Sequence, residues 1–101
     1  MTNFEPLAAT QPGLPNDAIT VLGAMAAPAR LRILRVLCEG EQTVSALLAL
    51  QPISQPNLSQ HLANLYRSGI VDRRRDGTYI YYRLAASEQG RLTRRICGLL
   101  A

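Results

Sequence analysis

The sequence is poor in the residues from which metal centres and many catalytic sites are built. It contains one histidine, His61, and two cysteines, Cys38 and Cys97, whereas a metal site needs three or four converging ligands. It has no glycine-rich phosphate loop and no Ser/His/acid set with an acid placed to orient the histidine. We therefore expect no metal, no other cofactor and no enzymatic activity.

Long apolar runs are also missing. No stretch reaches the roughly 20 residues that a transmembrane helix needs, and the N-terminus lacks the basic-then-apolar pattern of a signal peptide. We therefore expect a cytoplasmic protein that has no membrane partner. In that compartment both cysteines should be reduced thiols at rest.

Lysine is absent, so all 11 basic residues are arginine, and they are unevenly distributed. Residues 1–53 carry three arginines against four acidic residues, whereas residues 54–101 carry eight arginines against three acidic residues. The net charge of +4 therefore comes from the second half of the chain. Arginine favours planar, bidentate contacts with phosphate or guanine, although a GC-rich genome would produce the same bias.

A helix is predicted between Ser54 and Ser68. Ser54 is a suitable N-cap, Pro56 lies in the first turn, and Gly69 follows the end. At roughly 100° per residue, leucines gather on one side of this helix. The opposite side is polar and rich in amides, with Asn57, Gln60, Asn64 and Arg67.

A β-hairpin is predicted directly after this helix. Extended structure begins at residues 70–71, and residues 78–84 are β-branched or aromatic at nearly every position. Between them, Asp76 and Gly77 are expected to be the two positive-φ residues of a tight turn. The first strand carries three consecutive arginines, Arg73, Arg74 and Arg75. A polar helix beside an arginine-bearing hairpin is typical of a winged helix-turn-helix protein that binds DNA.

Four further helices are predicted, over residues 18–26, 28–39, 44–50 and 88–100. Residues 1–15 contain three prolines and are expected to form a flexible arm, and residues 16–101 are expected to form the DNA-binding and dimerisation domain. The expected fold is mainly α with a small β-hairpin, in the order of four helices, two strands and a last helix. A chain of this size buries only about two thirds of its unfolded surface, and the last helix is amphipathic, so we expect a homodimer.

Three motifs resemble one known family. The stretches APARLRIL, SQPNLSQHL and GTYIYYRL, in this order, resemble the ArsR/SmtB family of small dimeric bacterial transcriptional repressors, over roughly residues 18–100. The resemblance implies a winged-helix homodimer with its interface on the first and last helices. It also implies an inducer that weakens operator binding. Two recognition helices related by a two-fold axis would bind an imperfect palindrome in double-stranded DNA.

The predicted DNA-binding residues lie on the Ser54 helix and the hairpin. Amides of the helix can pair with adenine edges or phosphates, and arginines of the hairpin can reach phosphates or a minor groove. The resemblance adds residues where family members contact the groove and the backbone. The full set is Ser54, Gln55, Asn57, Ser59, Gln60, His61, Asn64, Arg67, Arg73, Arg74 and Arg75.

Three alternatives to this interpretation remain. The arginine run could be a solvated strand face, and His61 could be a packed residue at the helix edge. A winged helix could also serve only for protein interaction, but the RRRDG hairpin and the concentration of charge on this half favour DNA.

The cysteine pair resembles the thiol-based, persulfide-sensing branch of the family, the BigR and SqrR type, which uses one cysteine in each of the corresponding helices. Arg35 and Arg94 each precede a cysteine by three residues, and a cation within one helical turn favours the reactive thiolate. The function predicted on this basis is repression switched by modification of Cys38 and Cys97, by reactive sulfur or an oxidant. The alternatives are a response to arsenite or another soft ion, and cysteines that are purely structural.

Overall fold

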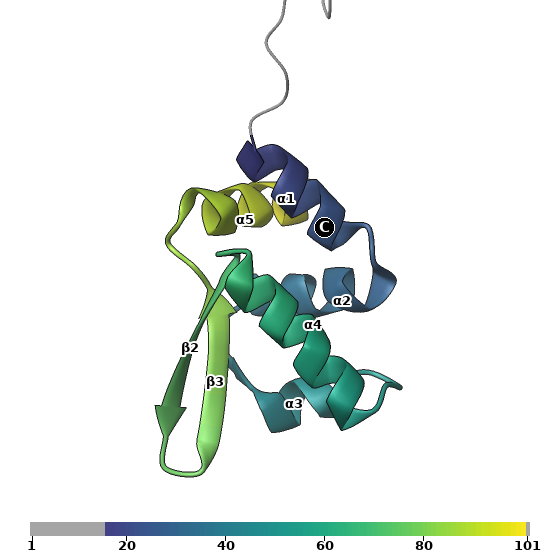
Figure 1. The fold of residues 1–101 in the computed structure, drawn as a ribbon, viewed down its shortest axis with the longest axis vertical. Coiled ribbons are helices and arrows are strands. Elements are labelled where there is room, and N and C mark those ends of the chain that lie inside the picture. The colour runs from purple at the N-terminus through teal and green to yellow at the C-terminus, as the bar shows by residue number, and fades with distance from the viewer. Residues whose placement is uncertain (1–15, 101) are drawn as a thin grey trace, which may run out of the picture.

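The computed structural model describes residues 16–100, and the arm predicted at residues 1–15 lies outside them. Its elements follow in the order α1 (Asn16–Met25), α2 (Pro28–Leu37), β1 (Gln42–Thr43), α3 (Val44–Ala49), α4 (Gln55–Arg67), β2 (Val71–Asp76), β3 (Tyr79–Leu84) and α5 (Glu88–Leu100). The predicted mainly α fold with a small hairpin is confirmed. α1 and α5 lie side by side at one end, and the hairpin extends to the other end (Figure 1).

The sheet contains one strand more than the sequence predicted. β1 pairs with β3, so the sheet has three antiparallel strands in the order β1-β3-β2. With only two residues, β1 carries no alternating pattern that could reveal it. Because β1 pairs with β3, the segment leading into α3 is hydrogen-bonded to the hairpin.

The three predicted serine and threonine caps are confirmed. In each, the side-chain oxygen accepts a hydrogen bond from the backbone N–H three residues further on. The pairs are Thr43 with Ala46 at 3.0 Å, Ser54 with Asn57 at 3.3 Å, and Ser87 with Gly90 at 3.0 Å. These caps fix where α3, α4 and α5 begin.

The turn of the hairpin differs from its prediction. Asp76 pairs with Tyr79 as the last residue of β2, and among the described residues only glycines have positive φ. Gly77, with φ of +63°, and Thr78 are therefore the two central residues. A positive φ at the first of them alone is the pattern of a type II′ turn rather than type I′, and it matches the twist of the strands equally well.

The core lies between α2, α3, α4 and the sheet. Seven leucine and isoleucine side chains in the three helices are fully buried: Ile33, Leu34, Leu37, Leu47, Leu58, Leu62 and Leu65. Burial of each contributes about 1.5–3 kcal/mol. The leucine side of α4 therefore attaches this helix to the domain and leaves its polar side outward.

The end of the molecule formed by α1 and α5 keeps an apolar surface. Ile19 and Leu22 are 55% and 51% exposed on α1, and Leu99 and Leu100 are 85% and 49% exposed on α5. The face that α5 buries within the chain is formed by Gly90, Thr93 and Cys97 instead. No helix within residues 16–100 is both long and apolar enough to cross a membrane.

Candidate DNA interface and cysteine pair

The polar face of α4 is open to solvent along its length. Six of the predicted residues on and before this helix are exposed, namely Ser54, Gln55, Asn57, Ser59, Gln60 and Arg67. His61 and Asn64 are half-buried at the edge of this face. α4 thus presents a row of amides and hydroxyls that could contact base edges and phosphates.

The hairpin of β2 and β3 is the wing of this fold, and its three arginines, Arg73, Arg74 and Arg75, do not all point to the same face. Because side chains alternate along β2, Arg73 and Arg75 share one face of the hairpin and Arg74 lies on the other. The guanidinium of Arg73 stacks 4.1 Å from the ring centre of Tyr66, at the end of α4. That contact brings one wing arginine to the side of the polar helix.

Arg74 is directed away from α4. Its guanidinium donates two hydrogen bonds to the carboxylate of Glu41, at 2.6 and 3.0 Å, and lies 4.2 Å from the ring centre of Tyr81. The bond with Arg74 holds the pKa of Glu41 below its usual range. Arg75 makes no ion pair or side-chain hydrogen bond with the described part of the chain. Arg73 and Arg75 therefore both lack a carboxylate partner within the described residues, and Arg75 lacks an aromatic partner as well.

A groove of about 370 Å³ separates α4 from the hairpin. Gln55 and Ser59 line it from the helix and Arg73 from the wing. Its other walls include Ser45, Thr78 and Tyr79, which were not among the predicted DNA-binding residues, and Tyr79 is 57% exposed. Thr78 and Tyr79 reach this groove because the hairpin folds back beside α4, whereas Ser45 reaches it from α3.

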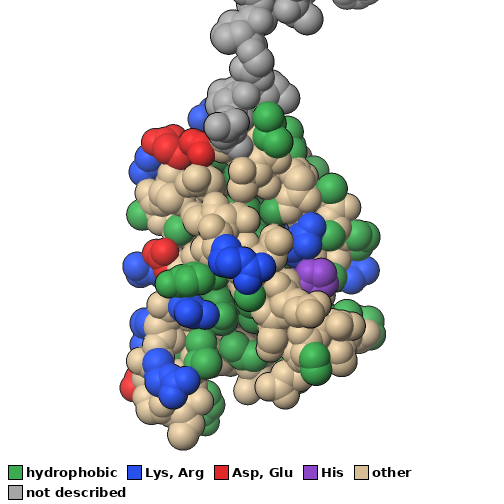
Figure 2. All heavy atoms as spheres, viewed as in Figure 1, with side chains coloured by type: hydrophobic (Ala, Val, Ile, Leu, Met, Phe, Trp, Pro, Cys, Tyr) green, Lys and Arg blue, Asp and Glu red, His purple; other side chains and the backbone are tan. Residues whose placement is uncertain are grey.

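A second hollow, of about 410 Å³, lies on the other side of the same helix. Gln60, His61, Asn64 and Arg67 line it, together with Arg30 of α2, which sequence reasoning missed. The Nε of Arg30 donates to the carbonyl oxygen of Ala24 at 3.0 Å. Figure 2 shows arginines gathered on the hairpin and over the helical face, beside the single histidine. Positive charge therefore flanks the amide row on both sides.

The two cysteines meet where α2 and α5 pack together. Cys38 is the half-buried C-cap of α2, Cys97 is buried in α5 with 6% exposure, and the thiol of Cys97 is close enough to raise the pKa of Cys38. Nη1 of Arg94 donates to the carbonyl oxygen of Cys38 at 3.1 Å. The fold therefore brings together two residues that are 59 positions apart in the sequence.

The expectation that neighbouring arginines favour the thiolate is wrong for Cys38. Burial raises the pKa of Cys38 to about 12, together with the hydrogen bond and charge of Cys97. Arg94 acts in the opposite direction but does not compensate for the loss of solvent, and Arg35 is not among the groups that affect this pKa. Residues 16–100 hold no cluster of three His, Cys, Asp or Glu side chains suited to a metal ion.

An exposed polar helix, seated on a helix-turn-helix core beside an arginine-bearing hairpin, defines the winged helix-turn-helix class of proteins. The sequence model of the bacterial regulatory proteins of the arsR family matches residues 27–73. The chain belongs to this ArsR family, as the three sequence motifs predicted.

The named relatives include both a transcriptional repressor and a transcriptional activator. The biofilm growth-associated repressor of Agrobacterium fabrum is 44% identical over 76 residues, which cover 75% of this chain and 65% of the repressor. The transcriptional activator HlyU of Vibrio cholerae is 41% identical over 71 residues, covering 70% of this chain and 66% of the activator. The chain thus spans just under two thirds of the length of these relatives. The expectation that it is not an enzyme agrees with their names.

Solved structures show the same fold. The transcriptional repressor BigR from Xylella fastidiosa superposes with a TM-score of 0.71 at 35% identity, covering 85% of this chain and 88% of that chain. The homodimeric winged helix-turn-helix DNA-binding domain of Mb0332 from Mycobacterium bovis gives a TM-score of 0.72 at 30% identity. This match covers 99% of this chain and 90% of the Mb0332 chain. The similarity to BigR supports the predicted relation to that branch of the family.

Proposed function

We propose that this ArsR-family regulator is a homodimeric, sequence-specific repressor whose operator binding is switched by modification of the pair Cys38 and Cys97. The observation that carries the DNA-binding part is the exposed amide row of α4, flanked by arginines. In this proposal the row enters the major groove, and Arg73 and Arg75 contact the adjacent backbone.

Dimerisation would occur through α1 and α5. Their exposed leucine and isoleucine side chains form an apolar surface at the end opposite the hairpin tip. The homodimeric state of the Mb0332 domain supports this assignment. Two copies joined there would place two α4 helices on successive major grooves of an imperfect palindrome, roughly 34 Å apart.

The cysteine switch would use the contact between α2 and α5. One thiolate attacks a sulfur atom of an inorganic polysulfide, so that a cysteine persulfide forms and a shorter polysulfide anion leaves. The second thiol then loses its proton and attacks the cysteine-bound sulfur, which forms a disulfide and expels hydrosulfide. The two cysteines give up two electrons, and polysulfide sulfur is reduced to hydrosulfide. A bridge between α2 and α5 would change how the two DNA-binding heads are held.

The test is a DNA-binding titration on the fragment upstream of the protein's own gene, with an unrelated fragment as control. Reduced protein, protein treated with polysulfide, and treated protein after reductant are compared, and intact mass is read on each sample. We expect tight binding, its loss on treatment and its recovery on reduction. Cys38→Ser and Cys97→Ser should each bind DNA when reduced and keep binding after treatment.

Other outcomes would contradict separate parts of the proposal. Equal affinity for both fragments would remove sequence-specific binding. Adduct formation without a change in affinity would make the cysteines structural. Release of DNA by arsenite but not by polysulfide would favour the soft-ion alternative. Increased transcription from a promoter carrying the bound site would make the protein an activator, as HlyU is named.

A further inference from the structure

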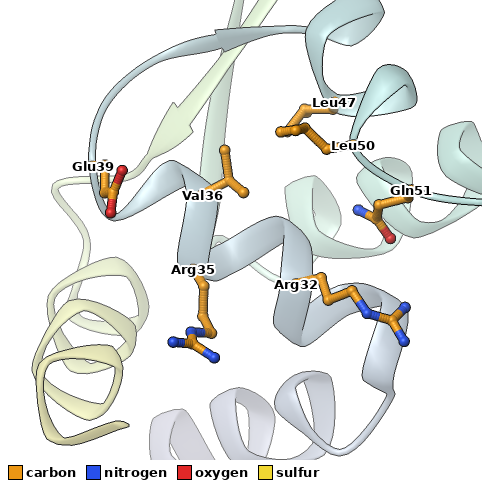
Figure 3. Close-up of a pocket in the computed structure, with 7 residues that line it drawn as sticks. All are labelled: Arg32, Arg35, Val36, Glu39, Leu47, Leu50 and Gln51. Carbon is orange, nitrogen blue, oxygen red and sulfur yellow. The ribbon is translucent and has the colours of Figure 1, made fainter. Parts of the chain in front are cut away.

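A cavity of about 380 Å³ opens between α2 and the segment that joins α3 to α4, and it shares no lining residue with the two hollows beside α4 (Figure 3). Its apolar wall is formed by Val36, Leu47 and Leu50. Small-molecule sites typically occupy about 300–1,000 Å³ and combine such a wall with a few placed polar groups. The size and lining of this cavity therefore suit a small ligand.

Gln51 supplies one polar group. It is only 8% exposed, and its Oε1 is buried without a hydrogen-bond partner in the described part of the chain. The amide points into the cavity from the joining segment (Figure 3). An unpaired buried acceptor is unfavourable unless a donor reaches it, so the cavity offers a position for an O–H or N–H group of a ligand.

Charge defines what else the ligand carries. Arg32 and Arg35 line the cavity from α2, and neither makes an ion pair or side-chain hydrogen bond with the described residues. Arg32 lies at the end where Gln51 lies, and Glu39 stands at the opposite end (Figure 3). Two arginines attract a carboxylate, and the glutamate disfavours a second negative charge at the far end.

We propose that this cavity binds a small organic monocarboxylate that has an apolar body and a hydroxyl or N–H group. The carboxylate pairs with Arg32 and Arg35, the donor group reaches Oε1 of Gln51, and the body packs on Val36, Leu47 and Leu50. The proposed ligand binds the protein in the absence of DNA. The test of this proposal uses no DNA, so the proposal stands or fails independently of the proposed repressor function.

The test is a ¹H–¹⁵N NMR titration of the full chain with 4-hydroxybenzoate and 4-hydroxyphenylacetate. We expect saturable shifts confined to α2 and the segment from α3 to α4, with a dissociation constant on the order of 1 mM or tighter. Benzoate lacks the donor and methyl 4-hydroxybenzoate lacks the charge. Each should bind roughly tenfold more weakly than 4-hydroxybenzoate.

Two variants assign the contacts. Gln51→Leu and Arg32→Gln should each weaken binding roughly tenfold, whereas Arg95→Gln removes an exposed arginine of α5 and should change nothing. Arg32 is a surface residue, so its variant keeps the test valid even if the Gln51 variant unfolds. Shifts that do not saturate, shifts centred elsewhere, or equal binding by Arg32→Gln and the parent protein would overturn the proposal.

Discussion

The carboxylate of Glu41 accepts both hydrogen bonds of the Arg74 guanidinium, although the two residues are 33 positions apart in the sequence. Their contact ties the segment before β1 to the wing. Arg75 differs from Arg74 because it makes no ion pair with any of residues 16–100. We therefore expect Arg75 to contribute more than Arg74 to DNA binding.

Arg75→Ala should weaken binding to all DNA sequences several-fold and reduce the slope of log affinity against log salt by about one, because one phosphate contact is lost. Arg74→Ala should change affinity less, since that guanidinium is already paired. Glu41→Gln should strengthen binding by releasing Arg74. Fluorescence anisotropy over a salt series measures all three. If Arg74→Ala causes the larger loss, the pair with Glu41 does not persist on DNA.

Gln60→Ala should relax sequence preference, because an amide that is bidentate to adenine contributes about 1–3 kcal/mol of discrimination. Arg67→Ala is the matched contrast and should weaken operator and unrelated DNA alike. Competition binding with single-base operator variants measures this difference in sequence preference between the two variants. A uniform loss of affinity in the Gln60 variant would make this residue a phosphate contact.

Leu22→Glu and Leu99→Glu should convert the proposed dimer into monomers, because each places a charge on the apolar surface of α1 and α5. Sedimentation velocity measures the result. Leu50→Glu provides the control, since Leu50 is 59% exposed but lies in the joint between α3 and α4. Dimers that persist in both α1 and α5 variants would place the interface elsewhere.

The reactivity of Cys38 should follow its raised pKa. With a pKa of about 12, the rate of alkylation by iodoacetamide should increase about tenfold per pH unit through the range 8 to 11, without a plateau. Cys97→Ala removes two causes of the shift and should move the profile to lower pH. Arg94→Gln removes a charge that lowers the pKa and should move it to higher pH. A plateau near pH 9 in the parent protein would show an unperturbed thiol.

Gly90→Ala should destabilise the domain by about 2–4 kcal/mol, because a Cβ at this position would lie 1.9 Å from the carbonyl oxygen of Ala85. Gly98→Ala is the control in the same helix, where a Cβ meets nothing within 4 Å. It should stabilise α5 by up to about 1 kcal/mol through helix propensity. Urea denaturation measures both, and equal effects would contradict the close packing of Gly90.

Local chemistry in the sequence predicted much of this fold. The caps at Thr43, Ser54 and Ser87, the leucine side of α4 and the position of the hairpin all follow from residue type and spacing over a few positions. Such features persist because their hydrogen bonds and buried faces are set by neighbours in the chain.

Relations between distant segments could not be predicted in this way. The two-residue strand β1, the bond between Arg74 and Glu41, and the position of Arg30 beside α4 depend on how elements pack. The pKa of Cys38 is the clearest case. Sequence spacing identified Arg94 as a cation near the thiols but could not give the burial of Cys38 that outweighs it.

The hydroxyl of Ser87 joins the segment that follows α4 to the start of α5. Ser87 Oγ donates to the carbonyl oxygen of Gly69 at 2.5 Å and accepts from the N–H of Gly90 at 3.0 Å. Rotation of α5 would therefore break one of these bonds or displace the segment after α4. The amide proton of Gly90 exchanges with solvent only when its bond to Ser87 Oγ opens, so its hydrogen-exchange rate would report how often the cap that anchors the start of α5 opens.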